Sequence, residues 1–435
     1  MLAAVAGAGL AGCAANDNGN GGGSGGATGS GGSRAGLGGS GPGGGNGGSG
    51  QGGSAGSGTG TGGAPGGATG SGGTPTTGSG GAVGAGGRTG AGGQAGRSGA
   101  GGTSATGGST GGGAGGTTGG NGAQVWVSPT GSDTNAGTQA APFLTIQHAH
   151  GAITAGGTIW VMPGTYQYNR TVNLSLAGSA NNVTRLWAVP GGARPVIDFS
   201  QQARDTSSNR GFTIPGSFWH LKGFEVKNAG DNCINISGSN NTVEWVEADS
   251  CDDTGIQITA SGAGTASNNL ILNCDAHDNF DTATGGENAD GIDAKLNIGP
   301  GNVLRGCRSW NNADDGYDLF GVTQVVTIDG CWAMANGQTS TGMRGVNADG
   351  NGFKLGGNGV PAVHVVTGSF AMGNRTCGYT LNNNTATPNV SGSGALGNNP
   401  DTCSITLRNR VIITMTAAMA IAAQRDANGN LPPVR

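Results

Sequence analysis

The sequence is poor in aromatic and charged residues: of its 435 residues, 5% are aromatic and 10% are charged. Residues 1–122 contain no Phe, Trp or Tyr and only four charged side chains, yet they hold 57 of the 98 glycines. Such a segment cannot bury enough apolar surface to offset the entropy lost on ordering it. Its glycines follow no three-residue period, which excludes a collagen-like helix. We therefore expect a disordered Gly/Ser/Thr-rich linker over residues 17–122.

Long apolar runs, basic clusters and paired cysteine motifs are also missing. The longest apolar run, Val411–Ala423, falls short of the roughly 18 residues that a membrane-spanning helix needs. The net charge is −4 and no basic run occurs, so a nucleic-acid partner is not expected. Neither CxxC nor a Cys/His ligand spacing appears, which argues against a zinc site.

The first 16 residues predict export. Leu10-Ala-Gly-Cys13 follows a short apolar run and resembles the lipobox of bacterial lipoprotein signals, in which Cys13 is lipidated. The basic residues that usually open such a signal are missing, and the alternative is an incidental apolar start to a disordered arm. We expect a secreted or outer-membrane-anchored bacterial lipoprotein that touches the membrane only through its lipid. The linker would then tether a monomeric folded domain at residues 123–403.

A repeat runs through the folded part. Gly255, Gly291, Gly316, Gly352 and Gly378 each follow an Asn- or Asp-containing turn, and short strand-like runs ending in Cys or Ser lie between them. β-rich runs at a period near 25, each too small to bury its own apolar face, are typical of a parallel β-helix. We therefore predict an all-β solenoid of about eight to ten coils.

Asparagines and cysteines recur at fixed places in this repeat. We expect the asparagines to form a ladder that bonds the backbone of successive coils: Asn279, Asn312, Asn336, Asn374 and Asn398. Stacking as small buried residues is favoured over disulfide formation for the cysteines: Cys233, Cys251, Cys274, Cys307, Cys331, Cys377 and Cys403. Thr145–Thr154 is expected to form a short helix that closes the open end of the first coil.

Side chains alternate in and out along a strand, so the repeat predicts two columns. The residues after the anchor glycines would point inward: Ile292, Tyr317, Phe353 and Tyr379. The next residues would point outward: Gln257, Asp293, Asp318, Lys354 and Thr380. Because neighbouring coils lie about 4.8 Å apart, Asp293, Asp318 and Lys354 would stand on successive rungs of one exposed face.

More carboxylates join this column from the coil turns. Asp290 and Asp315 directly precede their anchor glycines, and Asp314 precedes Asp315. Carboxylates this close repel one another unless a cation neutralises them, and hard oxygen ligands suit Ca²⁺ better than zinc. The alternative is a set of turn-forming aspartates that cap the coils, but it does not predict their stacking beneath a lone lysine.

A calcium site beside a lysine suits β-elimination from a uronate polymer. An ion that binds the substrate carboxylate would acidify the neighbouring C5 hydrogen and stabilise an enolate-like transition state. A neutral lysine, its pKa lowered by the nearby positive charge, would then remove that proton. Hydrolysis would instead need a carboxylate pair at a defined gap, with one member protonated.

Several segments in order closely resemble polysaccharide lyase family 9, whose members are right-handed parallel β-helix pectate lyases. The resemblance covers roughly residues 124–399 and rests on NADGIDAKL at 288–296, GNVLRGCRSW at 301–310, NADDGYDLF at 312–320 and DGNGFKLGG at 349–357. VWVSPTGSDTNAG at 125–137 is similar to the N-terminal cap of such proteins. The resemblance implies a calcium-dependent enzyme that acts on polygalacturonate, an acidic polysaccharide.

The resemblance also implies roles for residues. Lys354 matches the proton-abstracting base, and four aspartates match the calcium ligands: Asp290, Asp314, Asp315 and Asp318. The family has a small residue at position 293, so Asp293 is expected to be an extra ligand or a modulator of the site. Lys295 is either an alternative base or, as we favour, a group that binds a substrate carboxylate.

Two further functions compete with a pectate lyase. One is a lyase on another uronate-containing polysaccharide, and the other is a non-catalytic carbohydrate-binding β-helix displayed at the surface. Lys354 argues against the second, because an adhesin needs no lysine above the metal. Residues 404–435 do not continue the repeat, and the sequence indicates only a tail or a cap of uncertain structure.

Overall fold

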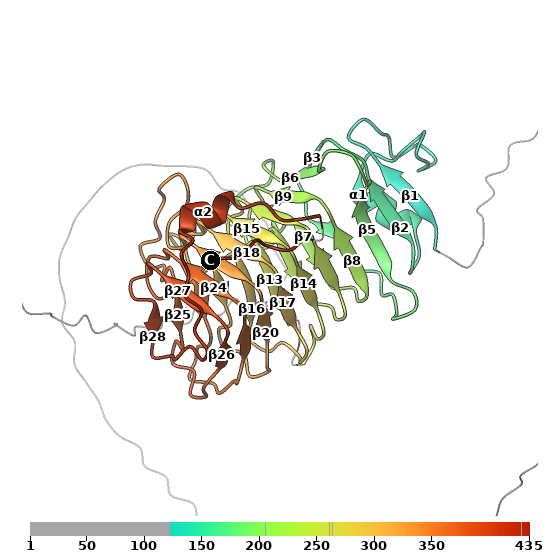
Figure 1. Cartoon of the computed structure of the whole chain (residues 1–435). Coiled ribbons are helices and arrows are strands. Elements are labelled where there is room, and N and C mark those ends of the chain that lie inside the picture. The colour runs from blue at the N-terminus through green and yellow to red at the C-terminus, as the bar shows by residue number, and fades with distance from the viewer. Residues whose placement is uncertain (1–121, 205, 261, 263, 428) are drawn as a thin grey trace, which may run out of the picture. The chain divides into compact units, whose positions relative to one another are not determined.

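The computed structural model describes residues 122–204, 206–260, 262, 264–427 and 429–435. Cys13 and the linker up to residue 121 lie outside the described residues, so the lipidation and linker predictions stay predictions. Within the described part, strands form three parallel sheets of ten, nine and nine strands (Figure 1). The chain enters sheet 1 with β1 and returns to it with β2, and from there each coil contributes a strand to sheet 1, then to sheet 2, then to sheet 3.

The three sheets run the length of the described part. Sheet 1 contains β1 (Gln124–Val127), β2 (Thr158–Val161), β5 (Thr184–Ala188), β8 (Trp219–Lys222), β11 (Thr242–Glu244), β14 (Leu270–Leu272), β17 (Val303–Arg305), β20 (Thr327–Asp329), β23 (Val365–Thr367) and β26 (Asn389–Ser391). Sheet 2 contains β3 (Thr165–Gln167), β6 (Val196–Asp198), β9 (Glu225–Lys227), β12 (Glu247–Asp249), β15 (Asp275–His277), β18 (Arg308–Trp310), β21 (Trp332–Met334), β24 (Phe370–Met372) and β27 (Gly394–Leu396). Sheet 3 contains β4 (Val172–Asn173), β7 (Phe212–Ile214), β10 (Ile234–Ile236), β13 (Ile256–Thr259), β16 (Ile292–Lys295), β19 (Tyr317–Asp318), β22 (Phe353–Lys354), β25 (Tyr379–Thr380) and β28 (Thr402–Cys403).

Strand alternation builds a continuous core inside these sheets. In β9 and β12 the central residues Val226 and Ala248 are fully buried, while the charged residues on either side are partly exposed. Tyr317, Phe353 and Tyr379 point inward as predicted, and their rings stack at centroid distances of 4.8 Å. The prediction of an all-β parallel β-helix is confirmed.

The bend between sheets 1 and 2 is made by one residue in the left-handed region of the backbone. On two coils this residue is Trp245 or Asn273, with φ of 55° and 53°. On later coils it is a glycine, such as Gly306 or Gly330. Glycine and asparagine adopt this conformation at little cost, so one residue turns the chain sharply enough to keep each coil short.

The asparagine ladder forms at the bend after sheet 2. The Oδ1 of Asn336 accepts from the Asn312 amide at 3.2 Å and from its Nδ2 at 3.0 Å, and Asn336 donates in turn to Asn374. A Cβ at Gly316 would lie 2.7 Å from the Asn336 Nδ2 and from the Gly352 carbonyl oxygen. The anchor position is therefore glycine because the next coil approaches it so closely.

The expectation for the cysteines is only partly right. Cys274, Cys307 and Cys331 are free, buried and stacked on successive coils, as expected. Cys233–Cys251 and Cys377–Cys403 are disulfides, which the sequence argument disfavoured. Cys251 occupies the ladder position itself, since its backbone amide donates to the Oδ1 of Asn279 at 3.0 Å. Each disulfide joins neighbouring coils, so adjacent cysteines pair where their side chains face each other.

In the part of the chain that the structure describes, two helices flank the coils (Figure 1). α1 (Ile146–Ala152) is capped by the Thr145 hydroxyl and buries Ile146 and Ala149 beside β1 and β2, as the sequence predicted. α2 (Ala417–Ala422) lies in the C-terminal segment, which does not extend the solenoid but packs on the outer face of sheet 2. Among the described residues, neither helix has the length and apolarity to cross a bilayer.

This C-terminal strap, residues 411–435, covers a second apolar cluster. Ile413, Ala420 and Val434 of the strap pack with Trp310, Trp332, Met334 and Met372 of sheet 2. The strap is also held by charge: Arg308 donates to the Ala423 carbonyl at 2.7 Å, and Arg425 pairs with Asp275 at 2.7 Å. Sheet 2 is therefore buried on both faces at β18 and β21, while sheet 3 carries the polar column.

Candidate metal and catalytic site

The predicted outward column exists on sheet 3. The register pairs Gln257 with Asp293, Asp293 with Asp318, Asp318 with Lys354, and Lys354 with Thr380. The expectation of an exposed face is wrong, because Asp293, Asp318 and Lys354 are 0%, 2% and 8% exposed. Neighbouring side chains cover one another there, and the loops 281–287 and 338–347 meet beside the column, where the Val346 amide donates to the Gly285 carbonyl at 3.0 Å.

The turn aspartates use one oxygen each to hold the next coil. Asp290 Oδ1 accepts from the Asp315 amide at 3.0 Å, and Asp315 Oδ1 accepts from the Asn351 amide at 2.6 Å. Asn351 continues the series by accepting from the Cys377 amide at 3.2 Å. These bonds fix the carboxylates rigidly and leave the second oxygen of Asp290 and of Asp315 facing the column.

Three of the four predicted ligands come together. One oxygen from each of Asp290, Asp315 and Asp318 lies within 4.8 Å of the others, and all three residues are buried. Asp293 Oδ1, Asp315 Oδ2 and Asp318 Oδ1 are buried without a hydrogen-bond donor. Buried hard oxygens without hydrogen-bond donors fit a cation, and here the ammonium of Lys354 lies 3.2 Å from Asp315 Oδ2, in a place that suits an ion such as Ca²⁺. The side chains of this cluster are therefore suited to the metal that the sequence predicts.

Asp314 lies in a neighbouring group. Its two oxygens accept from the Asn288 amide at 3.0 Å and the Asp349 amide at 2.6 Å, so both already hold backbone. Together with Asp315 and Asp349 it forms a second trio of carboxylates within 4.8 Å. Asp315 belongs to both trios and links them. Asp349 was not singled out from the sequence, although its place five residues before Lys354 in the same motif is a signal for it.

The Lys354 ammonium lies between the two trios. Its Nζ is 3.2 Å from Asp315 Oδ2, 3.2 Å from Asp349 Oδ2 and 3.6 Å from Asp318 Oδ2. Phe320 lies on another side, with its ring centroid 5.9 Å from Nζ. The Asp349 side chain is 52% exposed, so a ligand can approach Lys354 from the side on which Asp349 lies.

Lys295, which we expected to bind a substrate carboxylate, contacts carboxylates of the protein itself. Its Nζ lies 2.6 Å from Asp290 Oδ2, 3.2 Å from Asp318 Oδ2 and 3.4 Å from Asp293 Oδ2. The other contacts of Asp293 Oδ2 are the Thr254 hydroxyl at 2.9 Å and the Gln257 amide at 3.1 Å. Asp293 is therefore tied to the preceding coil, and Lys295 is engaged with carboxylates.

Burial and mutual repulsion raise the carboxylate pKa values. Burial is the largest cause and raises the pKa of Asp290 and of Asp315 well above the ordinary range, and the pKa of Asp293 to about 6. Burial alone would lower the pKa of Lys354, but the charges of Asp318 and Asp315 outweigh it and hold the pKa well above its usual value. The protein's own charges thus act against the lowered lysine pKa that the sequence argument anticipated beside calcium.

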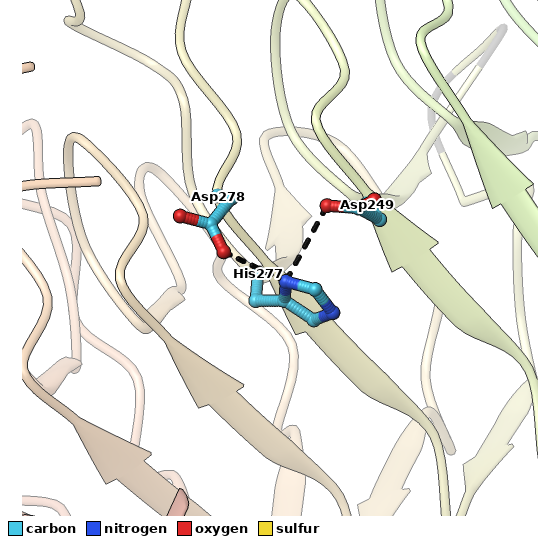
Figure 2. A group of neighbouring side chains, drawn as sticks. All are labelled: Asp249, His277 and Asp278. Atoms are coloured by element: carbon cyan, nitrogen blue, oxygen red, sulfur yellow. Dashed lines mark hydrogen bonds and ion pairs between the residues drawn. The ribbon is translucent and has the colours of Figure 1, made fainter. Parts of the chain in front are cut away.

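A second polar cluster, on sheet 2, has a different character (Figure 2). His277 Nδ1 lies 2.9 Å from Asp278 Oδ2 and 3.4 Å from Asp249 Oδ1, and Nε2 lies 3.1 Å from Glu247 Oε1. Burial lowers the pKa of His277, but the hydrogen bonds to Asp278 and Glu247 and the charge of Asp249 raise it to about 9. A protonated His277 satisfies this cluster, so it acts as a structural ion pair between β12 and β15.

Known proteins share this architecture and much of the sequence. The family described as "Pel9A-like, right handed beta helix region" matches residues 125–410. Pectate lyase L of Paenibacillus polymyxa (strain SC2) is 42% identical over 274 residues, and pectate lyase L of Dickeya dadantii (strain 3937) is 36% identical over 270. Each alignment covers 60% of this chain, and the chain spans 60% and 61% of the length of these two relatives.

Solved structures agree in fold. The crystal structure of pectate lyase Pel9A superposes with a TM-score of 0.61 at 30% identity, covering 71% of this chain and 87% of that one. A structure named rhamnogalacturonan lyase gives the same TM-score at 25% identity, covering 72% of this chain and 95% of that one. The right-handed solenoid and the resemblance to polysaccharide lyase family 9 are thereby confirmed. This chain belongs to the Pel9A-like right-handed β-helix family.

Proposed function

We propose that this chain is a calcium-dependent pectate lyase that cleaves polygalacturonate by β-elimination to 4,5-unsaturated oligogalacturonides. The observation that carries the proposal is the stacking of Lys354 directly above Asp318 and Asp293, beside buried carboxylate oxygens that lack donors. The pectate lyases with which the chain aligns at 36% to 42% identity support the substrate class.

The buried carboxylates would hold the ion: Asp290, Asp315 and Asp318, with Asp293 and Asp314 adjacent to them. When bound, calcium supplies positive charge against the substrate carboxylate, which acidifies the neighbouring C–H group and stabilises the enolate-like transition state. The backbone bonds from Asp290 and Asp315 to the next coil keep their free oxygens in place, so little reorganisation is needed.

Lys354 would act as the base. Its neutral amine takes the C5 proton, the C4–C5 double bond forms from those electrons, and the C4–O glycosidic bond breaks. The departing sugar oxygen takes a proton from solvent. Added positive charge in the cluster offsets the carboxylates that keep Lys354 protonated, and Asp349 holds Nζ at the accessible side of the site.

Absorbance of the unsaturated product tests this proposal. We expect purified protein with polygalacturonate to show rising ultraviolet absorbance with Ca²⁺ and none with chelator. Lys354→Ala should lower kcat by at least about 100-fold, the usual contribution of a general base. The variant should still unfold cooperatively above the assay temperature, at a Tm lower than that of the wild type because Asp315 loses its ion-pair partner. The matched control Lys222→Ala removes a lysine on sheet 1 that pairs with Glu244, and it should be fully active. Absence of product at every alkaline pH would refute a pectate lyase.

A second substrate is favoured by one comparison, namely the rhamnogalacturonan lyase fold neighbour. The chemistry would be the same, since its uronate also carries a carboxylate next to the acidic C5 hydrogen. Parallel assays on rhamnogalacturonan and polygalacturonate at equal uronate concentration distinguish the two. A kcat/KM that is higher on rhamnogalacturonan would reassign the substrate without changing the reaction. A protein that binds either polymer without forming product would instead be a carbohydrate-binding β-helix.

We also propose that the enzyme acts outside the cytoplasm as a monomer tethered through lipidated Cys13. Two disulfides in the solenoid support an oxidising compartment. Expression of the full chain in a bacterial host, followed by membrane fractionation, tests the anchor. Cys13→Ser should release the protein from the membrane fraction, and a wild-type protein that is soluble after export would contradict the lipid anchor.

A further inference from the structure

The ammonium of Lys295 lies on the Asp290 side of the proposed metal cluster. It contacts Asp290, Asp293 and Asp318 at 2.6 to 3.4 Å, and the Lys295 side chain is only 12% exposed. Asp290 and Asp318 are two of the three residues whose oxygens gather within 4.8 Å. Lys295 therefore neutralises two of the three carboxylates that would hold a metal ion, through Asp290 Oδ2 and Asp318 Oδ2.

We propose that Lys295 is a tethered cation that competes with calcium for this aspartate cluster, an inference that rests on the calcium dependence proposed above. Asp290 gives Oδ1 to the Asp315 amide, so its remaining oxygen, Oδ2, is the one that faces the cluster. That same oxygen makes the 2.6 Å contact with Lys295. A divalent cation and an ammonium on one oxygen lie close enough to repel each other strongly, because few water molecules screen them.

The competition has two consequences. At low calcium the ammonium compensates Asp290 and Asp293, whose buried charges Lys354 does not contact and which would otherwise destabilise the coils. When calcium enters, the ammonium must leave Asp290. The side chain is on the outward face of sheet 3, so the displaced ammonium moves outward from the sheet, to the side from which an anionic polymer would bind. Lys295 thus couples metal binding to the exposure of a positive charge for a substrate carboxylate.

Lys354 does not share this position. Its closest carboxylates are Asp315 and Asp349, each at 3.2 Å, and it makes only a 3.6 Å contact with Asp318. The two lysines therefore divide the cluster: Lys295 lies on the Asp290 side and Lys354 on the Asp349 side. Removal of Lys295 should act on metal affinity without removing the proposed base.

Calorimetric titration of calcium into chelator-treated full-length protein tests the inference. We expect Lys295→Met to lower the calcium Kd at least tenfold, whereas Lys295→Arg, which keeps the charge, should stay near wild type. Lys227→Met is the matched control, because Lys227 also contacts two carboxylates, Glu225 and Asp249, but on sheet 2. Its calcium Kd should not change. In chelator, Lys295→Met should unfold at a lower temperature, and calcium should raise its Tm by more than it raises that of the wild type.

An unchanged or weaker calcium affinity in Lys295→Met would overturn the proposal. If Lys295→Met does not fold without calcium, the double variant Asp293→Asn/Lys295→Met, which keeps the net charge of the cluster, replaces it. Its calcium affinity is compared with that of Asp293→Asn alone, and equal affinities in these two variants would also overturn the proposal. The titration is independent of turnover. A wild type that binds calcium but does not cleave polygalacturonate refutes the pectate lyase, while the affinity comparison still decides the role of Lys295. Absence of calcium binding in both proteins refutes the two proposals together.

Discussion

The two oxygens of Asp315 have different tasks. Oδ1 accepts the Asn351 amide at 2.6 Å and so holds the next coil, whereas Oδ2 is buried, faces the cluster and lies 3.2 Å from Lys354. One carboxylate therefore combines a structural bond with a charge for the metal. The same division holds at Asp290, with the Asp315 amide on one oxygen and Lys295 on the other.

This division predicts that an amide at position 315 separates folding from metal binding. In Asp315→Asn the amide oxygen can still accept from Asn351, but the NH₂ group in place of Oδ2 repels a cation. We expect a Tm near that of the wild type and a calcium affinity reduced by more than about 100-fold, since even outer-shell partners are worth 10- to 100-fold. Calorimetry and thermal unfolding measure the two effects. Asp315→Ala is the comparison, and it should lose both.

His277 gives a pH dependence of stability that is separate from catalysis. Its folded-state pKa is raised to about 9 from the model-peptide value of 6.5, so the folded state binds the proton more tightly than the unfolded state. The resulting stabilisation, roughly 3 kcal/mol, is fully present below pH 6.5 and is lost as the pH rises through 9. The Tm of the wild type should therefore fall across this window.

His277→Gln is the control for that pH profile. Glutamine keeps a hydrogen-bonding side chain but does not titrate, so its Tm should be lower than that of the wild type at pH 6 and should converge with it near pH 10. A parallel decline of the two Tm profiles between pH 6.5 and 9 would assign the loss of stability to other groups.

At the scale of elements, the asparagine ladder is the feature that holds one coil on the next. Asn336 accepts from the backbone and side chain of Asn312 and donates to Asn374 and to the Ser309 carbonyl. It is 1% exposed, so water cannot replace these partners. Asn336→Ala would leave the buried Asn312 amide without its acceptor and the Ser309 carbonyl without the Asn336 side chain. We expect a loss of about 3–5 kcal/mol in the free energy of unfolding, since each unsatisfied buried group costs about 1–3 kcal/mol.

Denaturant unfolding measures this cost, and the ladder supplies its own control. Asn398 ends the series and is only half-buried, so water can reach the amide of Asn374 when Asn398 is removed. Asn398→Ala should therefore lose clearly less stability than Asn336→Ala. Equal losses at the two positions would mean that the ladder is not what makes the inner coils cohere.

The ladder and the columns could be predicted because they repeat along the chain. The recurring anchor glycines, 25 residues apart from Gly291 to Gly316 and 36 apart from Gly316 to Gly352, place Asp293, Asp318 and Lys354 in register, and side-chain alternation then sets which face they share. What Lys295 contacts could not be predicted in this way. Alternation places it outward, but the direction of a flexible lysine stem depends on the charges around it, which only the assembled coils define. The disulfide at Cys251 was missed for a related reason, because it replaces an asparagine at a ladder position.

At the scale of the whole molecule, the strap is the element that the repeat does not encode. It joins residues 150 apart in sequence, as in the contact between Arg425 and Asp275, and the repeat contains no pattern that predicts such a pair. The sequence did show that residues 404–435 leave the repeat. It did not show which sheet they cover, because the sequences of β18 and β21 resemble those of the other strands. Only the structure shows that both of their faces are buried.

The strap sits on sheet 2 and the proposed site on sheet 3, so stability and catalysis should be separable. Arg425 is 6% exposed at its side chain, and it bonds Asp275 at 2.7 Å and the Gly306 carbonyl at 2.6 Å. Because Arg308 also pairs with Asp275, Arg425→Ala leaves that carboxylate neutralised, and we expect a loss of about 1–3 kcal/mol rather than the 3–5 kcal/mol of a fully broken buried pair. Arg305→Ala, which breaks a half-exposed pair with Asp329, should cost less than about 1 kcal/mol.

Limited proteolysis should cut the strap faster in Arg425→Ala, because Trp310 and Trp332 lose part of their cover, while kcat on polygalacturonate at low temperature stays at the wild-type value. A fall in kcat without faster cleavage would instead mean that sheet 2 transmits its state to the catalytic column.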